Sequence, residues 1–348
     1  MVVAGAGPAG SAAAIALARA GRRVLLADPL DARPGTLKIG ETLPAVAVAV
    51  LRDLGLPDPG SAGVAIPSAG TSAAWGGDGL LESDAVGDPH GHGWHLDRTR
   101  FDAWLRDGAR EAGAELCEGR VVKDSSGVQV RVGSSEATVA CDWIVDATGR
   151  RAAIARSQGA QRHRSDRLVA LYAAVATGAG DRDTRTRLEA TPSGWWYSAR
   201  VGERRRVAAF LTDSDLVRPD WRSRSGFRAA LCGTSHLLPT EELTLESAPA
   251  TTAAHGSRLE PATGDGWLAV GDAALAFDPL SSQGILNALV TGLEGATAAD
   301  AHLGGDTGAA ASYERRLARV WSAYEVNRER AYALERRWPE AGFWARRR

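Results

Sequence analysis

The sequence predicts an α/β fold in which a parallel-sheet unit is interrupted by an antiparallel β-sheet and followed by a helical C-terminal tail. Three observations support this prediction. The chain opens with a short apolar strand, a glycine-rich turn and an alanine-rich helix; strand-like segments recur between residues 160 and 255; and an apolar strand returns at residue 267. The opening strand, turn and helix are typical of a Rossmann-type nucleotide-binding domain.

The glycine-rich turn has the spacing that a dinucleotide requires. It comprises Gly5, Gly7, Pro8, Ala9 and Gly10. Gly5 permits the tight turn, Gly7 lets the backbone approach a pyrophosphate, and Gly10 lets the helix pack closely on the sheet. Free N–H groups at the helix N-terminus would bind the phosphates. The turn therefore predicts a binding site for a dinucleotide cofactor.

The second strand ends in a carboxylate, Asp28, which lies 18 residues after Gly10. An acid at this point can bind both ribose hydroxyls of an adenosine and disfavours a 2′-phosphate. A lone glycine motif is a weak signal, but here the strand before it, the helix after it and the acid are all present. The segment therefore favours FAD or NAD over NADP.

The other elements of the N-terminal part are predicted from apolar periodicity and turn residues. Helices are expected at Ser11–Ala20, Pro44–Leu54 and Arg98–Gly113, and a loop at 28–34. We expect a hairpin within Val64–Leu81 and a buried strand at Cys141–Asp146. A β-meander is predicted from the short strands Ala114–Glu118, Arg120–Lys123, Val128–Val132 and Ala137–Ala140.

The central part is predicted to form an antiparallel sheet from Arg167–Val175, Arg185–Thr191, Gly194–Arg200 and Arg206–Thr212, followed by a helix at Trp221–Leu231. The first unit then resumes with a strand at Trp267–Val270 and a helix at Gln283–Ala299, and the tail from Ala309 is helical. We therefore expect a nucleotide-binding domain in two parts, 1–160 with a small sheet insertion near 64–95, and 256–300. The substrate domain would be 161–255 and the C-terminal helices 301–348.

Composition excludes several classes of function. The 348 residues have a formal net charge of −1, which gives no global signal for nucleic acid or an anionic membrane. The longest apolar run is too short to span a bilayer, so stable membrane insertion is not expected. Three scattered cysteines fit neither a disulfide framework nor a metal site, and no signal peptide precedes the first strand. We therefore expect a cytoplasmic protein.

A second segment, far along the chain, suggests which dinucleotide is bound. A buried strand leads into a Gly-Asp pair, and a short loop then opens a helix; the candidate residues are Gly271, Asp272, Pro279, Ser282, Gln283 and Gly284. Asp272 could hold a polyol, and free N–H groups near Gly284 could receive charge from a ring. Two nucleotide-facing elements so far apart suit an elongated cofactor such as FAD. The alternative is an ordinary helix capped by Ser281 or Ser282.

Four segments in this order resemble the flavoprotein monooxygenases of the para-hydroxybenzoate hydroxylase superfamily, in the branch shared with flavin-dependent halogenases and geranylgeranyl reductases. They are VVAGAGPAG at the start, RTRFDAWL after Asp97, DATGRRAAIAR from Asp146, and GDAALAFDPLSSQG from Gly271. The resemblance implies a Rossmann-type FAD domain with an antiparallel sheet over the flavin. It also implies that Asp28 binds the adenosine ribose, Asp272 the ribityl chain and Arg98 the cofactor, with Pro279–Gly284 along the flavin ring.

The segment from Lys38 to Pro44 is similar to Gly-Glu segments that pass beside the flavin in halogenase-like relatives. Gly40 would permit close approach, and Glu41 or Thr42 could contact the ring or the substrate. Lys38, Glu41 and Thr42 are therefore candidate cofactor-binding residues. The alternative is the start of a helix, with Thr42 as its cap and Pro44 in its first turn.

The chain departs from these relatives at several points. Aromatic hydroxylases have a serine where this chain has Ala152, in a segment that helps to receive NADPH. A second glycine motif is absent, so electrons would come from NAD(P)H bound transiently or from a separate flavin reductase. Halogenases have a tunnel lysine after the Gly-Glu segment, but 63–81 contains no lysine, and their Trp-x-Trp-x-Ile-Pro motif is not met. These departures disfavour halogenation.

Aromatic residues suggest a wall for the substrate. Trp195, Trp196 and Tyr197 are consecutive on a predicted strand, so Trp195 and Tyr197 share one face and Trp196 has the other. One face would line the flavin cavity, with Trp75 as a further candidate; packing within the sheet core is the alternative. The histidines of the loop 90–95 lack a partner cysteine or paired acid, so no metal site is predicted.

These observations favour an FAD-dependent monooxygenase that transfers oxygen from a flavin C4a-hydroperoxide to an aromatic or bulky apolar substrate. A natural-product intermediate is one candidate substrate. The Trp side chain of a peptide is another, because GWWYSA and DPLSSQG also resemble flavoproteins that mature Trp-derived quinone cofactors. The partners would be that substrate, O2 and a reductase, and no catalytic side chain is assigned. The alternatives are a halogenase without the usual lysine, an isoprenoid-type flavin reductase, and a non-catalytic flavin-binding partner.

Overall fold

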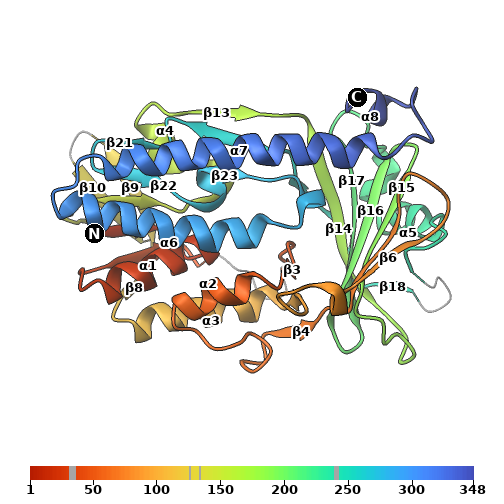
Figure 1. Ribbon diagram of the computed structural model, residues 1–348, viewed down its shortest axis with the longest axis horizontal. Helices are drawn as coiled ribbons and strands as arrows, with labels where there is room; N and C mark the ends of the chain where they lie inside the picture. The colour runs from red at the N-terminus through yellow and green to blue at the C-terminus, as the bar shows by residue number, and fades with distance from the viewer. Residues whose placement is uncertain (31–36, 125–126, 133–134, 239–242) are drawn as a thin grey trace.

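The computed structural model describes residues 1–30, 37–124, 127–132, 135–238 and 243–348. The molecule is elongated, with a parallel-sheet unit at one end and a large, mainly antiparallel sheet at the other (Figure 1). Part of the predicted loop 28–34 lies outside the described residues. Among the residues that are described, no helix has both the length and the hydropathy needed to cross a bilayer.

The first unit is built on a six-stranded sheet in the order β21-β22-β12-β1-β2-β8. All neighbouring pairs are parallel except β21–β22. The strands are β1 (Val2–Ala4), β2 (Leu25–Asp28), β8 (Glu115–Glu118), β12 (Ile144–Asp146), β21 (Thr263–Gly264) and β22 (Trp267–Ala269). β1, β12 and β22 are fully buried and continuously apolar up to the acid that ends β12, which is typical of a parallel sheet covered on both faces.

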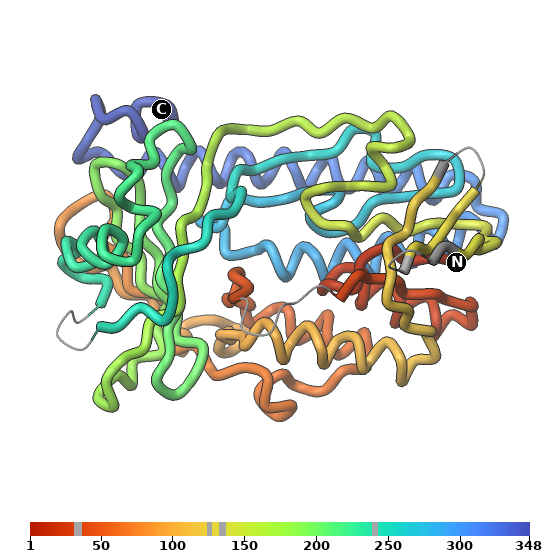
Figure 2. Tube along the Cα trace, turned by 180° about the vertical axis from the view of Figure 1, so that it is seen from behind, coloured from red at the N-terminus to blue at the C-terminus, as the bar shows by residue number. Residues whose placement is uncertain are grey.

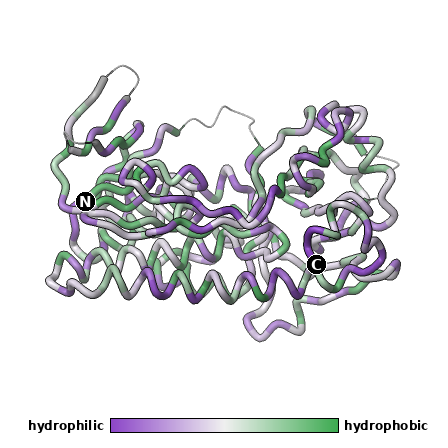
Figure 3. Tube along the Cα trace, turned by 90° about the horizontal axis from the view of Figure 1, so that it is seen from above, coloured by the Kyte–Doolittle hydropathy of each residue, from purple (hydrophilic) through white to green (hydrophobic). Residues whose placement is uncertain are grey.

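Helices cover one face of this sheet. α1 (Pro8–Arg19) contacts both α3 (Arg98–Glu111) and α6 (Gly284–Leu303), and α2 (Ala47–Asp53) and α7 (Ala309–Ala333) contact α6 in turn. α1 and α6 approach closely because their contact is made by small residues: a Cβ placed on Gly292 would lie 2.4 Å from the carbonyl oxygen of Ala9. The strands beside the N-terminus are drawn mostly in green in Figure 3, in agreement with their burial.

The opposite side holds a three-stranded meander of β9 (Arg120–Asp124), β10 (Gly127–Val132) and β11 (Ser135–Thr138), and the short helix α4 (Ala153–Ser157), which contacts β9, β12 and β22. The sequence placed the strand at residues 114–118 in this meander, which is wrong. That strand is β8, and it pairs in parallel with β2. The reason is that α3, which precedes β8, packs against α1 and returns the chain to the edge of the parallel sheet beside β2.

The second unit is an eight-stranded sheet in the order β18-β14-β17-β16-β15-β5-β6, with β19 also paired to β14. Its strands are β14 (Leu168–Ala176), β15 (Thr186–Thr191), β16 (Gly194–Gly202), β17 (Arg205–Asp213), β18 (Thr244–Leu245), β19 (Ala250–Ala253), β5 (Gly70–Ala74) and β6 (Leu81–Asp84). The pairing of β15 with β5 is parallel and the rest are antiparallel. The predicted antiparallel layer is therefore present, and it recruits β5 and β6 from the insertion near 64–95.

Two small sheets complete the fold. One is formed by β3 (Thr42–Leu43), β7 (Trp94–Leu96) and β4 (Ala65–Pro67), and the other by β13 (Gln161–Arg164), β20 (Ser257–Glu260) and β23 (Leu275–Ala276). Because residues 42–43 form β3, the second helix starts at residue 47, three residues later than the sequence predicted. The N-cap of this helix is Val46 and not Thr42. Thr42 is thus a strand residue and not a helix cap.

The long helix α7 connects the two units. It begins beside α6 and runs along the molecule to the large sheet, where α8 (Gly342–Ala345) ends the chain (Figures 1 and 2). Side chains from the last turns of α7 and from α8 pack on one face of the large sheet, with Tyr332, Phe343 and Trp344 buried there. α5 (Arg224–Cys232) packs on the other face through Phe227 and Leu231. The predicted α/β fold with a helical C-terminal tail is confirmed.

Candidate functional site

A cavity of about 680 Å³ lies between the carboxyl ends of β1, β12 and β22 and the face of the large sheet. Ligands of doubly wound folds bind at this edge of the parallel strands. Of the residues predicted to bind the cofactor, the cavity is lined by Gly7, Pro8, Ala9, Lys38, Glu41, Thr42, Arg98, Asp272, Pro279, Ser282 and Gly284. Segments as far apart in the sequence as residues 7 and 288 therefore meet around one space.

The glycine turn shows why small residues occupy it. Gly5 has a φ of +104°, and a Cβ there would lie 2.3 Å from the carbonyl oxygen of Ala147. A Cβ on Gly10 would lie 1.8 Å from the carbonyl oxygen of Gly5, so Gly10 packs against the turn and does not line the cavity. A Cβ on Gly7 would meet no described atom within 4 Å. The space in front of Gly7, where the N-terminus of α1 has no side-chain cap from any described residue, fits a pyrophosphate.

Asp28 ends β2 and holds the turn. Its Oδ2 accepts a hydrogen bond from the Ala6 N–H at 2.7 Å, and its Oδ1 accepts one from the Leu30 N–H at 2.8 Å. The side chain is half-buried and lies beyond the cavity lining. Each carboxylate oxygen has a second lone pair, so the group can still accept from two ribose hydroxyls. The geometry fits an adenosine that extends from the cavity along the end of β2.

Arg98 and Lys38 both pair with Asp102 in the cavity lining, and we call these three residues the Asp102 cluster. Asp102, one turn after Arg98 on α3, accepts from the Arg98 guanidinium at 3.1 Å and from Lys38 Nζ at 3.0 Å. Arg98 also donates to the carbonyl oxygens of Ile39 and Gly40. Two cations facing one buried acid leave this wall with a net positive charge, which suits a cofactor that carries phosphates.

Glu41 is buried beside the large sheet, next to Gly40, whose carbonyl oxygen Arg98 binds. Tyr197 on β16 donates a hydrogen bond to Glu41 Oε2 at 3.0 Å, and Thr42 Oγ1 lies 3.2 Å from the same Tyr197 hydroxyl. Oε1 of Glu41 has no hydrogen-bond partner within the described part of the chain. Burial raises the pKa of Glu41 above its usual range, against the opposing hydrogen bond from Tyr197 and the charge of Arg98. The pKa of Tyr197 is also raised by burial, so its hydroxyl stays protonated and donates.

The Gly-Asp pair after β22 is fixed by two arginines. Arg150 lies 3.5 Å from the Asp272 carboxylate and donates to the carbonyl oxygens of His255 and Phe277. Arg162 donates to the carbonyl oxygens of Asp272 and Ala273, and burial lowers its pKa to about 10. Gly271 has a φ of +57° and lies behind the lining, where a Cβ would approach Ala9. The Asp272 side chain is thereby presented to the cavity.

The segment before α6 has a special backbone. Asp278 Oδ1 accepts from the Leu280 N–H at 2.9 Å, and Ser282 follows with a φ of +51°. The helix starts at Gly284, with Gln283 as its N-cap and no side-chain cap from the described residues, so neither Ser281 nor Ser282 caps it. Pro279, Ser282 and Gly284 line the cavity, whereas Gln283 is exposed outside it. Uncapped N–H groups therefore face the cavity at this end as they do at α1.

The aromatic wall is narrower than the sequence predicted. Tyr197 lines the cavity, together with Tyr172 on the neighbouring part of the sheet. Trp195 has the same face as Tyr197, but the C-terminal segment covers it, and its Nε1 donates to the Tyr332 hydroxyl at 3.2 Å. Trp196 lies on the other face, in the core with Phe210 and Phe227. Trp75 packs on Trp195 and Trp344. The structure places Trp75, Trp195 and Trp196 in packing contacts outside the cavity lining.

Several polar residues of the site were not among the predicted binding residues. Asp102, Tyr172, Arg150 and Asp278 all line the cavity. For Asp102 a signal existed, because an acid four residues after Arg98 lies on the same helix face. Arg150 lies within the segment DATGRRAAIAR, and the structure pairs it with Asp272. Tyr172 and Asp278 carry no local signal, because their neighbours come from distant segments.

The fold and the site together define a flavoprotein with a Rossmann-type cofactor domain and a covering sheet. The chain belongs to the family described as FAD binding domain, which matches residues 1–291. It is therefore an FAD-dependent oxidoreductase of the superfamily branch that the four sequence segments predicted. The glycine turn, Asp28 and the two uncapped helix starts fit FAD.

Three comparisons with known proteins show its relatives. The chain is 29% identical to the putative FAD-dependent oxidoreductase LodB of Marinomonas mediterranea, over 99% of this chain and 96% of LodB. The peptidyl tryptophan dihydroxylase QhpG, essential for tryptophylquinone cofactor biogenesis, matches with a TM-score of 0.80 and 26% identity, over 99% of this chain and 77% of QhpG. The myxobacterial chondrochloren halogenase CndH matches with a TM-score of 0.87 and 23% identity, over 100% of this chain and 85% of CndH.

Proposed function

We propose that this protein is an FAD-dependent monooxygenase that inserts one oxygen atom of O2 into the ring of a tryptophan side chain held in a polypeptide. The observation that supports this most directly is the composition of the cavity wall formed by the large sheet. That wall combines the apolar surface of Ala170, Ala209 and Leu211 with the rings of Tyr172 and Tyr197. Small residues beside aromatic rings leave space for a planar, bulky group.

The proposal assigns roles to the protein's own groups. FAD, once bound and reduced, would supply the electrons and activate O2. The apolar sheet wall would exclude water and orient the ring, and Tyr197 would keep its proton and hold Glu41 in place. N–H groups at the start of α6 would stabilise negative charge on the ring system beside them. Glu41 Oε1, buried and without a described partner, would accept a hydrogen bond from an N–H of the flavin or of the indole.

The opening of the cavity leaves room for a substrate that is larger than a free metabolite. Gly40, Arg151, Pro279 and Ser282 line the cavity and are themselves exposed, so the rim is open to solvent on the side of the predicted flavin turn. A side chain that projects from a polypeptide could enter there while its backbone stays outside. The similarity to QhpG, a peptidyl tryptophan dihydroxylase, supports the same substrate class.

Halogenation is the competing activity, since CndH shares the fold. The chain has two lysines, Lys38 and Lys123. Among the described residues that line the cavity Lys38 is the one lysine, and its ammonium pairs with Asp102 at 3.0 Å in the Asp102 cluster. A lysine whose ammonium is paired with an acid is poorly suited to relay hypohalous acid to a substrate. We therefore favour oxygenation, with NAD(P)H or a separate flavin reductase as electron source.

The test is to supply the FAD-loaded protein with a reduced-flavin source, isotopically labelled O2 and a short peptide that contains one tryptophan. We expect O2 consumption that depends on the peptide, and a tryptophan that gains one labelled oxygen atom for each O2 consumed. The matched control is the same peptide with phenylalanine in place of tryptophan. Incorporation of bromide or chloride in place of oxygen would contradict the proposal, and so would O2 consumption that ignores the peptide.

Lys38→Met separates the two activities within the protein. Arg98 still holds Asp102 in this variant, so FAD affinity should fall by about fivefold or less, as expected for a half-exposed ion pair. The identity of the product should not change. A halogenase that used this lysine would instead lose its halogenated product while its flavin still reacted with O2.

A further inference from the structure

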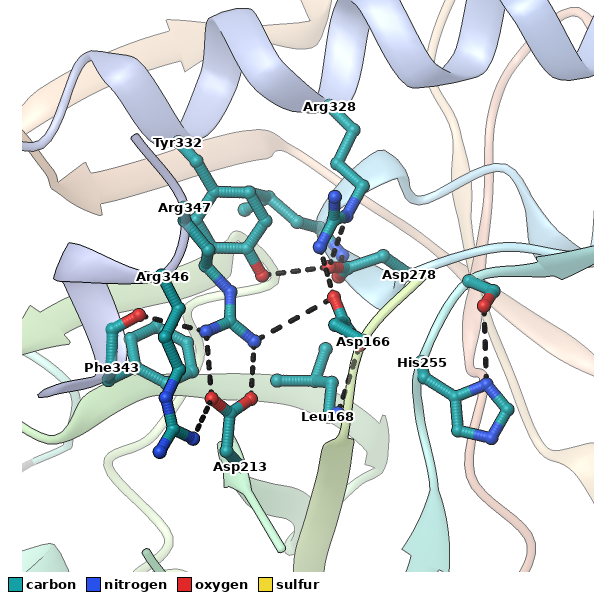
Figure 4. A network of polar contacts seen from close by, with 12 residues as sticks. Asp166, Leu168, Asp213, His255, Asp278, Arg328, Tyr332, Phe343, Arg346 and Arg347 are labelled. Atoms are coloured by element: carbon teal, nitrogen blue, oxygen red, sulfur yellow. Dashed lines mark hydrogen bonds and ion pairs between the residues drawn. The ribbon is translucent and has the colours of Figure 1, made fainter. Parts of the chain in front are cut away.

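A network of buried polar and charged side chains lies behind the segment Pro279–Gly284, which we expect to face the flavin. We call it the Asp278 network; its central members are Asp278, Tyr332 and Arg328. Asp278 is completely buried, and its Oδ2 accepts from the Tyr332 hydroxyl at 2.8 Å and from Arg328 Nε at 3.4 Å. Both partners come from the last turns of α7 (Figure 4). Arg328 also pairs with Asp166, just before β14. A helix that lies beyond the family match at 1–291 therefore contacts Asp278, a residue that lines the cavity.

The network extends to the C-terminus of the chain. Arg347 donates to both oxygens of Asp213, at 2.6 and 3.3 Å, and lies 3.8 Å from Asp166. Its guanidinium stacks 3.7 Å from the Phe343 ring centroid and 5.2 Å from that of Tyr332. Asp213 and Arg347 are 2% and 3% exposed. Three acids, Asp166, Asp213 and Asp278, are thus matched by arginines from the C-terminal segment, which is a requirement for stable burial of charge.

Asp278 transmits this anchoring to the turn that faces the cavity. Its Oδ1 accepts from the Leu280 N–H, its own N–H donates to the Tyr324 hydroxyl at 2.9 Å, and its carbonyl oxygen accepts from the Ser281 hydroxyl at 2.8 Å. Every polar group of this residue is therefore occupied by the turn or by α7. Four residues later Ser282 adopts a left-handed backbone at φ +51°. A non-glycine residue persists there only when its surroundings determine the backbone.

We propose that Tyr332 and Arg328 are positioning residues for the FAD site, which act through Asp278 to hold the segment Pro279–Gly284 against the flavin ring. The inference rests on the proposed course of the flavin along this segment, and it does not depend on the substrate. In this view α7 is part of the cofactor site although its own side chains there do not line the cavity within the described residues. Loss of the anchor should loosen the turn while the glycine motif at α1 stays intact.

Tyr332→Phe tests the proposal with the smallest change. The phenyl ring keeps its packing against Phe343 and Trp344 but loses the hydrogen bond to Asp278, and also the one that the hydroxyl accepts from Trp195 Nε1. Tyr313→Phe is the matched control, because Tyr313 is also buried on α7 and donates to the carbonyl oxygens of Ala269 and Thr291, away from Asp278. Both variants should lower the melting temperature. Only Tyr332→Phe should raise the FAD dissociation constant, by about tenfold, and shift the visible absorption band of the bound flavin.

Two readouts decide the outcome. FAD titration and the flavin spectrum report whether the segment Pro279–Gly284 is correctly placed against the flavin. The melting temperature of the apoprotein reports stability. If Tyr332→Phe is as destabilised as Tyr313→Phe but binds FAD with unchanged affinity and spectrum, the network is only structural and the proposal is overturned. Asp278→Asn gives a second test should Tyr332→Phe not fold, because it retains the size of the side chain; it should change the flavin spectrum in the same direction. An unchanged spectrum in Asp278→Asn would also overturn the proposal.

These outcomes are separate from those of the proposed oxygenation. Wild-type protein that binds FAD but does not oxidise the peptide contradicts the proposed function and leaves the anchoring intact. If wild-type protein oxidises the peptide but Tyr332→Phe has unaltered FAD affinity and flavin spectrum, the proposed function stands and the anchoring role of Tyr332 is contradicted.

Discussion

The Tyr197 hydroxyl donates a hydrogen bond to Glu41 Oε2 at 3.0 Å and thereby joins the large sheet to the segment 37–42 inside the cavity. The two residues are 156 positions apart in the sequence. Glu41 is 1% exposed, and its second oxygen has no partner among the described residues. A carboxyl group in this setting is costly to ionise, and it is available to a ligand that brings an N–H donor.

Glu41→Gln should preserve folding and change function. The raised pKa means that the folded state binds this proton more tightly than the unfolded state, so the stabilising contribution is complete below the normal glutamate pKa and is lost as pH rises through the higher, folded value. Glutamine retains an acceptor for Tyr197 and cannot ionise. We expect the variant to gain stability relative to wild type as pH rises from 5 to 8 in urea-unfolding experiments.

The same variant shows which ligand Glu41 contacts. A change in the absorption spectrum of the bound flavin, without substrate, assigns the contact to FAD. A raised KM for the peptide with an unchanged flavin spectrum assigns it to the substrate. Wild-type values for the spectrum, KM and kcat together would contradict a role for Glu41 in either site.

Asp28→Ala should weaken FAD binding by about tenfold to a hundredfold. The substitution removes the expected ribose contact and leaves the N–H groups of Ala6 and Leu30 without their acceptor, and each such loss costs about 1–3 kcal/mol. Asp28→Asn keeps one carbonyl oxygen and should bind FAD with intermediate affinity. Fluorescence titration of the apoprotein measures both. Wild-type affinity in Asp28→Ala would show that the adenosine does not extend to this residue.

Trp196→Phe and Tyr197→Phe should affect different properties, although the residues are adjacent: the first should lower stability and the second activity. Trp196 packs between Phe210 and Phe227, so shortening it should lower the free energy of unfolding by about 1–3 kcal/mol and leave the KM for the substrate unchanged. Tyr197→Phe leaves Glu41 without its donor and should lower kcat/KM by about tenfold. Chemical unfolding and steady-state kinetics on both variants test this contrast. An altered KM in Trp196→Phe would place that indole in the substrate site.

His95 should make the protein less stable in mild acid. Burial and the nearby charge of Arg206 lower its pKa to about 4, while its Nε2 is paired with the Thr186 hydroxyl at 2.8 Å. Between its unfolded pKa of about 6.5 and the folded value, the unfolded state binds the proton more tightly, so stability falls as pH falls through this window. One pKa unit corresponds to about 1.4 kcal/mol, and the full effect is therefore about 3 kcal/mol.

The comparison for His95 is His95→Gln, whose amide can still bond Thr186 but does not titrate. The difference in the free energy of unfolding between wild type and variant should shift in favour of the variant as pH falls from 7 to 4.5. Parallel pH profiles for the two proteins would show that this buried histidine does not titrate in the expected range.

Much of the fold could be predicted because its signals are local. The glycine turn, the apolar strand before it and Asp28 lie within one short stretch, and the periodicity of residues 98–113 defines α3. The pairing of the β-strands was harder to predict from the sequence. The strand at 115–118 has the same local pattern as the meander strands, but it pairs with β2 because α3 returns it there. Likewise, a period of two assigned Trp195 and Tyr197 to one face but could not show that α7 and α8 cover only the Trp195 end.

The sequence by itself determined the cofactor class and the order of the elements, since backbone turns that bind phosphates need glycines at fixed short spacings. The tertiary structure alone decided which side chains share the cavity. Glu41 meets Tyr197, Asp102 joins Arg98 to Lys38, and Asp278 receives Tyr332 from a helix near the end of the chain. Such contacts depend on how distant segments pack, and a buried polar group has no local sequence pattern that names its partner.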